Sequence, residues 1–513
     1  MPRLALRGPL LLPLAALAAV LALVGSGASR PLSAPAPRAA EFVFHRDHVI
    51  GTSFDLRVVA PDEATADAAE LTALAEIERL RMVFSTYEAE SEISKLNGTR
   101  EPVAVSADFA AVLERYAVWQ QKSGGAFNSQ VGELVREWKA GERANREPDA
   151  AALERIVNDL KGPGWTLDAR ARTVTRRTVQ PLDLNAVAKG YMIRKAADAV
   201  RAAHPTVTAL LANLGGDIFA WGDRTWAVGV QDPANHFDNA APLFGVRLKD
   251  QAVATSGGYQ RGYTIEGKRY SHIFDPRTGR PAEGVASATV VAGDNTTANA
   301  LATTLCVLKP EEGLKLVEGV EGAACLIIDA SGRPHRSAGF KLFEVAPARA
   351  LAQDKKDAPT GAAWPAGHQV TVAVELPKIE AKRYRKPYTA IWIEDDKGKA
   401  VRTLAVWGNA PKYLKDLTDW WRIGKGDNDL VKAVTRATRG PGKYDLAWDG
   451  KDDKGNALPQ GTYTVRVEVH REFGDHVRQS GKIECKDKAA TTRLEKNSET
   501  AETLIEFKEG KKK

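Results

Sequence analysis

The chain has 513 residues, of which 43% are hydrophobic and 27% are charged. This composition excludes a wholly disordered, collagen-like or coiled-coil chain, and the length suggests about three domains, or two with appendages. The net charge of +7 arises from 72 basic and 65 acidic residues that are mixed along the sequence, so no basic cluster indicates nucleic-acid binding. The three cysteines lie far apart, which excludes a cysteine-built zinc module and a disulfide-rich scaffold.

The first 29 residues have the pattern of an export segment. Arg3 and Arg7 precede an apolar run at residues 9–24, and small residues follow the run. This order is typical of a signal peptide over residues 1–29, and a retained inner-membrane anchor is the alternative because the run is close to bilayer length. Both interpretations predict a periplasmic or cell-envelope protein.

A mixed domain follows this segment. Residues 30–42 are rich in proline and alanine and are typical of a linker. Residues 43–347 combine helix and strand patterns. The clearest helix spans residues 62–82, where an apolar stripe begins at Leu71, and a second helical pattern covers residues 109–119. Strand-like runs occur at residues 209–212 and 324–329.

The C-terminal third has a different pattern. Residues 348–366 break all periodicity and predict a second linker. Hydrophobic residues then alternate with polar ones at residues 369–376 and 462–469, as in half-buried strands, so residues 367–486 are predicted to form a smaller all-β sandwich. The remaining residues, 487–513, are predicted to form a disordered, charged tail. The expected fold class is α+β, followed by this sandwich.

Several common catalytic motifs are absent from the sequence. It contains no GxxxxGK[ST] phosphate loop, no GxGxxG fingerprint, no HExxH and no GxSxG. P-loop phosphoryl transfer, a standard dinucleotide fold, zincin proteolysis and α/β-hydrolase chemistry therefore have no sequence support.

Polar residues gather instead in four segments of the mixed domain, at residues 85–97, 183–191, 255–281 and 299–303. Hydroxyl groups, glycine amides, Lys189 and His272 are the donors and positive charges that hold phosphate groups. Asn299 and Thr303, four residues apart, share one helix face and could hold a hard cation. Each segment alone is more often a turn or a solvated surface, and only their joint occurrence indicates a site.

These segments belong to a longer ordered set of motifs. The set comprises Ile50-Gly-Thr52, Ser85-Thr-Tyr87, Gly124-Gly-Ala-Phe127, Asp183-Leu-Asn-Ala-Val-Ala-Lys-Gly-Tyr191, Asn213-Leu-Gly-Gly-Asp217, Gln231-Asp-Pro233, Ala254-Thr-Ser-Gly257, Ser271-His-Ile-Phe-Asp-Pro-Arg-Thr-Gly279 and Ala300-Leu-Ala-Thr303. In this order the motifs resemble those of the ApbE-type FAD:protein FMN transferases, or flavin transferases. The resemblance covers residues 43–345.

The resemblance implies an activity. Members of this family cleave FAD and attach FMN through a phosphoester bond to a Thr or Ser hydroxyl of an exported redox protein, releasing AMP. By this resemblance, the residues that bind FAD are Tyr87, Asp183, Lys189, Thr255, Ser256, Gly257 and His272. The expected catalytic residues among them are Asp183, Lys189 and His272.

The resemblance also implies a Mg²⁺ site. The positions that match the family's metal ligands are Asn299, Thr303 and the carbonyl groups of Ala188 and Ala302. The sequence departs from the family pattern because Asn299 and Asn128 stand where aspartates are usual. An amide oxygen brings no negative charge, and Mg²⁺ favours carboxylates, so the metal affinity should fall unless Asp294 or the FAD phosphates compensate.

Two alternatives to a transferase follow from these departures. The chain could be a non-catalytic FAD-binding module, or an FAD pyrophosphatase in which water replaces the acceptor hydroxyl. The family's acceptors carry a Ser/Thr-Gly-Ala-Ser/Thr element. Residues 26–29 match it, but they lie where signal cleavage is expected, so we expect the acceptor to be another exported protein.

The smaller domain has a resemblance of its own. Residues 367–485 are similar to a periplasmic β-sandwich domain of unknown function that is found fused to such transferases. From this we expect a role in docking the acceptor or another partner protein.

Overall fold

The computed structural model describes residues 39–345 and 361–510. Within these ranges it leaves out residues 163, 236, 260, 382–383, 409–410, 428–429, 432–434 and 437. The predicted export segment at residues 1–29, and most of both predicted linkers, lie outside the described residues. Among the helices that are described, none combines the length and the apolar character needed to cross a membrane.

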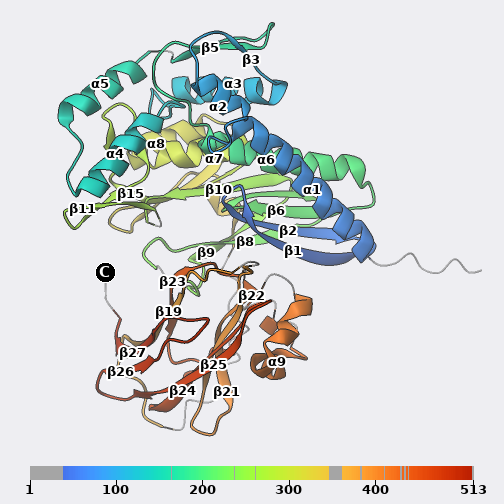
Figure 1. Ribbon diagram of the computed structural model, residues 1–513, viewed down its shortest axis with the longest axis vertical. Helices are drawn as coiled ribbons and strands as arrows, with labels where there is room; N and C mark the ends of the chain where they lie inside the picture. Colours follow the sequence, from blue (N-terminus) through green and yellow to red (C-terminus); the bar gives the residue numbers. More distant parts are fainter. Residues whose placement is uncertain are drawn as a thin grey trace, which may run out of the picture. The chain divides into compact units, whose positions relative to one another are not determined.

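An eight-stranded antiparallel sheet forms the centre of the first domain (Figure 1). Its strands, in spatial order, are β1 (Ala40–Val49), β2 (Thr52–Ala60), β6 (Ala209–Leu214), β7 (Asp217–Gly222), β10 (Gln251–Gly257), β15 (Val285–Ala292), β16 (Ala324–Asp329) and β17 (Pro334–Arg336). Since β1 begins at Ala40, the last residues of the predicted linker 30–42 belong to this sheet.

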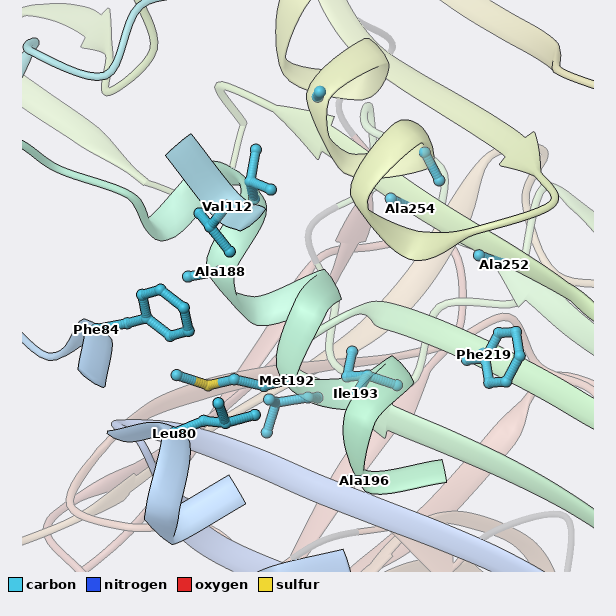
Figure 2. Close-up of a cluster of buried hydrophobic side chains, with 14 of the residues drawn as sticks. Leu80, Phe84, Val112, Ala188, Met192, Ile193, Ala196, Phe219, Ala252 and Ala254 are labelled. Atoms are coloured by element: carbon cyan, nitrogen blue, oxygen red, sulfur yellow. The ribbon is translucent and has the colours of Figure 1, made fainter. Parts of the chain in front are cut away.

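Helices cover one face of the sheet and bury the main core against it. They are α1 (Glu63–Phe84), α6 (Asn185–Ala203) and α7 (Asn295–Leu305). Figure 2 shows Met192 and Ile193 of α6 between Leu80 of α1 and Phe219 of β7. These four side chains are at most 4% exposed, and each stabilises the fold by roughly 1.5–3 kcal/mol.

Helix α1 confirms the prediction for residues 62–82, and Ile77 and Leu80 of the predicted stripe are buried, but Leu71 is not part of the buried face. Asp62 caps the helix by accepting a hydrogen bond from the Thr65 amide at 2.8 Å. Ala73 and Ile77 are buried, whereas Leu71 is 66% exposed. Two residues subtend about 200° on a helix of 3.6 residues per turn, so Leu71 lies opposite Ala73.

A small sheet covers the other face of the large one. It contains β8 (Trp226–Val230), β9 (Phe244–Leu248) and β18 (Glu344–Val345). Trp226 and Val246 pack with Val253 and Leu326 of the large sheet in a second core. The first domain therefore has three layers.

The first domain also contains further helices, a small three-stranded sheet and two hairpins. They are α2 (Glu92–Asn97), α3 (Ala107–Lys122), α4 (Gly132–Ala144), α5 (Ala150–Leu160), α8 (Pro310–Glu318), the 3₁₀ helix η1 (Phe340–Leu342), the sheet of β3 (Val103–Ala104), β4 (Trp165–Asp168) and β5 (Thr173–Arg176), and the hairpins β11 (Gly262–Ile265) with β12 (Lys268–Ser271) and β13 (Phe274–Asp275) with β14 (Arg280–Pro281). Helix α3 confirms the prediction for residues 109–119. Trp138 contacts both hairpins: its ring centroid lies 5.1 Å from that of Tyr270, and its Nε1 donates a hydrogen bond to the Gly279 carbonyl at 3.0 Å.

The second domain is a β-sandwich, as predicted. One sheet contains β23 (Gly442–Trp448), β19 (His368–Leu376), β27 (Thr503–Glu509) and β26 (Ala490–Leu494), and the other contains β22 (Thr435–Arg436), β21 (Ala400–Trp407), β20 (Tyr388–Glu394), β24 (Gly461–His470) and β25 (His476–Cys485). The helix α9 (Thr418–Gly424) and the 3₁₀ helix η2 (Pro411–Asp416) complete it. Trp364 packs against Trp448, with ring centroids 4.9 Å apart, so the domain begins within the predicted linker 348–366.

The prediction of a disordered tail at residues 487–513 is wrong. Strand β27 pairs with both β19 and β26, and its Ile505 and Phe507 are fully buried. Apolar and charged residues alternate in this strand, so only one of its faces contributes to the core. The charges that suggested a tail lie on the other face.

All three cysteines are buried and unpaired. Burial raises the pKa of Cys306 to about 12, that of Cys325 to about 11 and that of Cys485 to about 12. These thiols are core residues.

Candidate active site

A large cleft opens where the helical layer of the first domain meets the hairpins. Its volume is about 1160 Å³, above the roughly 300–1,000 Å³ of pockets for small ligands. Ten of the eleven residues that the sequence analysis selects line it, namely Tyr87, Asp183, Ala188, Lys189, Thr255, Ser256, Gly257, His272, Asn299 and Thr303. The eleventh, Ala302, does not line the cleft and is fully buried. The segments that resemble the family motifs therefore meet in one place.

The start of α6 contributes Asp183 and Lys189. An oxygen of Asp183 accepts a hydrogen bond from the Asn185 amide at 3.0 Å, which fixes the carboxylate beside the helix. Burial raises the pKa of Asp183, while that hydrogen bond and the positive charge of Lys189 lower it. A partly buried acidic group beside a cation in a cleft is typical of a functional site.

A glycine sets the distance between α6 and α7. A Cβ atom on Gly190 would lie 2.7 Å from the carbonyl oxygen of Asn295, so only glycine allows the two helices to approach this closely. The approach brings Ala188 and Lys189 to the same cleft as Asn299.

The end of β10 forms another wall of the cleft. The Thr255 hydroxyl lies 2.9 Å from that of Thr289, and the Ser256 hydroxyl lies 3.4 Å from that of Thr303. A Cβ atom on Gly257 would lie 2.6 Å from the Ala286 carbonyl oxygen. This glycine therefore lets the end of β10 pack closely against the Ala286 backbone, where no side chain would fit.

His272 lies between β12 and β13, with its ring held by the backbone. Nδ1 is 3.2 Å from the Arg261 carbonyl oxygen and must donate to it, because a carbonyl oxygen only accepts. The Nε2 lone pair of the neutral ring is then free to accept a proton. Burial lowers the pKa of His272 below its ordinary value of 6.5, and the positive charges of Arg261 and Lys189 lower it further.

Helix α7 presents Asn299 and Thr303 on one face. Asp294 caps the helix, accepting from the Thr297 amide at 3.0 Å and from the Thr296 hydroxyl. This carboxylate is committed to the cap, so the structure does not support the expectation that Asp294 compensates for Asn299.

Asp217 is a cleft residue to which the sequence analysis assigns no role. It is the first residue of β7, lines the cleft and is 9% exposed. Burial raises its pKa, while the charge of Lys189 and the proximity of Asn299 lower it. The signal that could have identified Asp217 is its position directly after two glycines in the motif Asn213-Leu-Gly-Gly-Asp217. The sequence analysis used this motif only for the family resemblance.

Tyr87 and Asn128 differ in how they meet the cleft. Tyr87 is 93% exposed on the loop after α1 and lines the cleft from there. Asn128 is buried, donating to the Leu160 carbonyl at 3.3 Å and accepting from the Gln130 amide at 2.9 Å. These bonds give Asn128 a structural role in the wall of the cleft.

Comparison with known proteins identifies relatives of both domains. The model of the ApbE family matches residues 50–327, and that of a family described as "Predicted periplasmic protein (DUF2271)" matches residues 369–502. An FAD:protein FMN transferase of Treponema pallidum is 34% identical over 314 residues, covering 57% of this chain and 86% of the relative. One of Klebsiella pneumoniae is 30% identical over 270 residues, covering 52% of this chain and 82% of the relative.

Two solved structures share the architecture of the first domain. The ApbE protein from Thermotoga maritima has a TM-score of 0.54 and 29% identity, with 60% of this chain and 100% of that chain covered. The flavin transferase ApbE from Vibrio cholerae has a TM-score of 0.51 and 25% identity, with 60% of this chain and 99% of that chain covered.

Proposed function

This chain belongs to the ApbE family, and from that premise we propose that it is an FAD:protein FMN transferase. It would cleave FAD, attach FMN to a Thr or Ser hydroxyl of an exported acceptor protein, and release AMP. The observation that carries this proposal is the convergence of ten selected residues from separate segments on one cleft. The names of the relatives favour a transferase over a binding module or a pyrophosphatase.

The side chains of the cleft suit each part of the reaction. The acceptor oxygen attacks the phosphorus of the FMN half. The bond from this phosphorus to the bridging oxygen breaks, and AMP leaves with that oxygen as part of its own phosphate. His272 would take the proton of the attacking hydroxyl on Nε2, since Nδ1 is engaged and the lowered pKa keeps the ring neutral at pH 7. Lys189 would neutralise charge on the diphosphate, which is the main requirement of such transfers.

The cleft also offers ligands for a divalent cation. Asn299 and Thr303 carry an amide and a hydroxyl oxygen, and Ala188 lines the same cleft. The buried Asn299 Nδ2 has no hydrogen-bond partner among the described residues. Oxygen donors of this kind suit Mg²⁺. A bound Mg²⁺ supplies charge neutralisation on the diphosphate and the leaving AMP. No group of three or more His, Cys, Asp or Glu side chains forms a metal cluster in the part of the chain that the structure describes.

The location of the reaction follows from the second domain. Its match to a family of predicted periplasmic proteins supports a periplasmic or envelope location. We propose that residues 1–29 direct export, as a cleaved signal or as an inner-membrane anchor, and that the acceptor carries the Ser/Thr-Gly-Ala-Ser/Thr element.

The products of one reaction test this function. Purified protein is incubated with FAD, Mg²⁺ and a carrier protein fused to a Ser-Gly-Ala-Thr segment, and a denaturing gel is examined for flavin fluorescence on the carrier. We expect fluorescence on the carrier and release of AMP. Free FMN with AMP would indicate a pyrophosphatase, and unchanged FAD would indicate a binding module. A carrier with Ala-Gly-Ala-Ala in place of the element is the matched control.

A further inference from the structure

The hairpin between β6 and β7 fixes Asp217 at the edge of the cleft. Leu214 and Asp217 pair across a two-residue turn, and both turn residues, Gly215 and Gly216, have positive φ angles of 64° and 100°. Positive φ at both central residues is the requirement of a type I′ turn, the tightest connection between two strands. Asn213 stabilises the turn by accepting a hydrogen bond from the Gly216 amide at 2.9 Å. The backbone that carries Asp217 is therefore rigid.

Helix α7 is attached to the same strand. Asn295 Nδ2 donates a hydrogen bond to the carbonyl oxygen of Ile218 at 3.0 Å, one residue beyond Asp217. Asn299 lies one turn further along the same face of α7. The attachment places Asn299 beside Asp217, and both side chains line the cleft.

Both side chains are buried, and the amide group of Asn299 is incompletely hydrogen-bonded. Asp217 is 9% exposed, and its carboxylate interacts with the Asn299 side chain and with the charge of Lys189. Asn299 is 6% exposed, and its Nδ2 lacks a hydrogen bond of ordinary geometry among the described residues, although it lies near Asp217. A buried amide N–H without a hydrogen-bond partner costs about 1–3 kcal/mol, so we interpret this pair as part of a site that a bound group completes.

We propose that the carboxylate of Asp217 supplies the negative charge of the divalent-cation site in this chain, while Asn299 supplies only an amide oxygen. This inference rests on the proposed function, because the cation is the one that the transfer would use. A carboxylate has two oxygens, so one can accept from Asn299 Nδ2 while the other binds the cation. Mg²⁺ sites commonly combine one or two carboxylates with phosphate oxygens of the substrate.

A different role for Asp217 makes a different prediction. If Asp217 only balances the charge of Lys189, removing its carboxylate would alter the cleft's affinity for FAD and leave cation binding unchanged. Asp183 is a suitable control, because its carboxylate lies in the same cleft and also interacts with Lys189, but the structure does not place it on α7 or β7.

The test measures cation binding directly on the full-length protein. Mn²⁺ is titrated without FAD or acceptor, and free Mn²⁺ is quantified by electron paramagnetic resonance. We expect Asp217→Asn to weaken Mn²⁺ binding at least tenfold and Asp183→Asn to change it less than threefold. Asn299→Asp should strengthen binding, and the double variant Asp217→Asn/Asn299→Asp should return to within threefold of the unsubstituted protein, because it moves the carboxylate across the site.

Thermal unfolding identifies variants that do not fold. Asp217→Ser removes the same charge with a smaller side chain and replaces Asp217→Asn if that variant is unfolded. Unchanged Mn²⁺ affinity in the Asp217 variant, equal weakening by Asp183→Asn, or a double variant no better than Asp217→Asn would each overturn the proposal. The gel assay for covalent flavin tests the transferase separately, so a failure there is distinguishable from a failure of this cation site.

Discussion

His272 combines two properties that a proton acceptor needs. The Arg261 carbonyl fixes the tautomer through Nδ1, and burial with nearby positive charge keeps the ring neutral. A neutral imidazole with a free Nε2 can remove a proton from an acceptor hydroxyl without first losing one of its own. The position of the ring and its protonation state thus have separate structural causes.

This arrangement predicts a particular pH dependence. The rate of FMN transfer should fall on the acid side as His272 becomes protonated, and the midpoint should lie below 6.5 because the pKa of the ring is lowered. The measurement is kcat/KM for FMN transfer between pH 5 and 9. His272→Gln should remove this acid limb and reduce the rate by about 10²–10⁴-fold. An acid midpoint above 7 in the unsubstituted protein would contradict the assignment.

At the residue scale, the sequence located most of the cleft but not the function of each side chain. Hydroxyl, glycine and basic residues in ordered motifs predicted ten cleft residues, because such motifs are specific when they occur together. Asp217 could not be singled out, since its importance depends on α7 lying against β7. Leu71 was misplaced because an apolar residue in an amphipathic helix does not by itself reveal which face is buried.

At the scale of elements, the contact between α6 and α7 determines the geometry of the site. These helices carry the lysine, the amide and the hydroxyl of the cleft, and Gly190 allows their close approach. A helix interior normally disfavours glycine by roughly 1 kcal/mol relative to alanine. Glycine is present at position 190 because a larger residue would leave no space for the backbone of α7.

Gly190→Ala should therefore destabilise the protein, although alanine favours helices. The added Cβ would meet the Asn295 carbonyl at 2.7 Å, and relieving this clash should cost about 1–3 kcal/mol in the free energy of unfolding. Urea denaturation measures the effect. Gly293→Ala is the matched control, because no atom lies within 4 Å of the added Cβ there. Equal stability of the two variants would show that α6 can shift without cost.

The final strands of the second domain lead to a prediction about truncation. A chain ending at residue 486 loses β26 and β27, and with them Ile505 and Phe507, each worth roughly 1.5–3 kcal/mol when buried. We expect the sandwich to unfold, which near-ultraviolet circular dichroism of its tryptophans would detect. Removing only residues 511–513 should leave the signal intact. A native spectrum after the longer truncation would contradict this prediction and show that residues 487–513 are dispensable for folding.

Helices and strands were predictable where their hydrophobic periodicity was strong. The prediction was wrong where many charged residues obscured that periodicity. Helices α1 and α3 and strands β6, β16, β19 and β24 follow their sequence patterns. The alternation in β27 is also visible in the sequence, but the many charged residues around it suggested disorder. The pairing of this strand with β19, more than a hundred residues earlier, is a tertiary contact that local pattern does not contain.

At the scale of the whole molecule, the chain joins a catalytic domain to a sandwich that holds none of the selected site residues. The matching region of this chain covers the whole of the Thermotoga maritima protein, so the first domain has the content of a complete ApbE fold. The sandwich is therefore expected to serve partner recognition.

Removing the second domain tests this division of roles. A chain ending at residue 345 should transfer FMN to a short acceptor segment at the rate of the full chain, because every residue of the cleft is retained. Its KM for the native acceptor protein should rise about tenfold or more, if the sandwich contributes at least 1.4 kcal/mol to docking. Steady-state kinetics with both acceptors gives the comparison. Unaltered KM for every native acceptor would exclude the docking role.

The three buried thiols make folding independent of the redox state of the surroundings. No covalent cross-link between cysteines holds either domain together, and pKa values near 11 to 12 leave almost no thiolate to react with oxidants. Reducing agents should neither weaken nor rescue the protein. Active material could therefore be prepared inside a reducing cytosol, without the oxidative folding machinery on which many exported proteins rely.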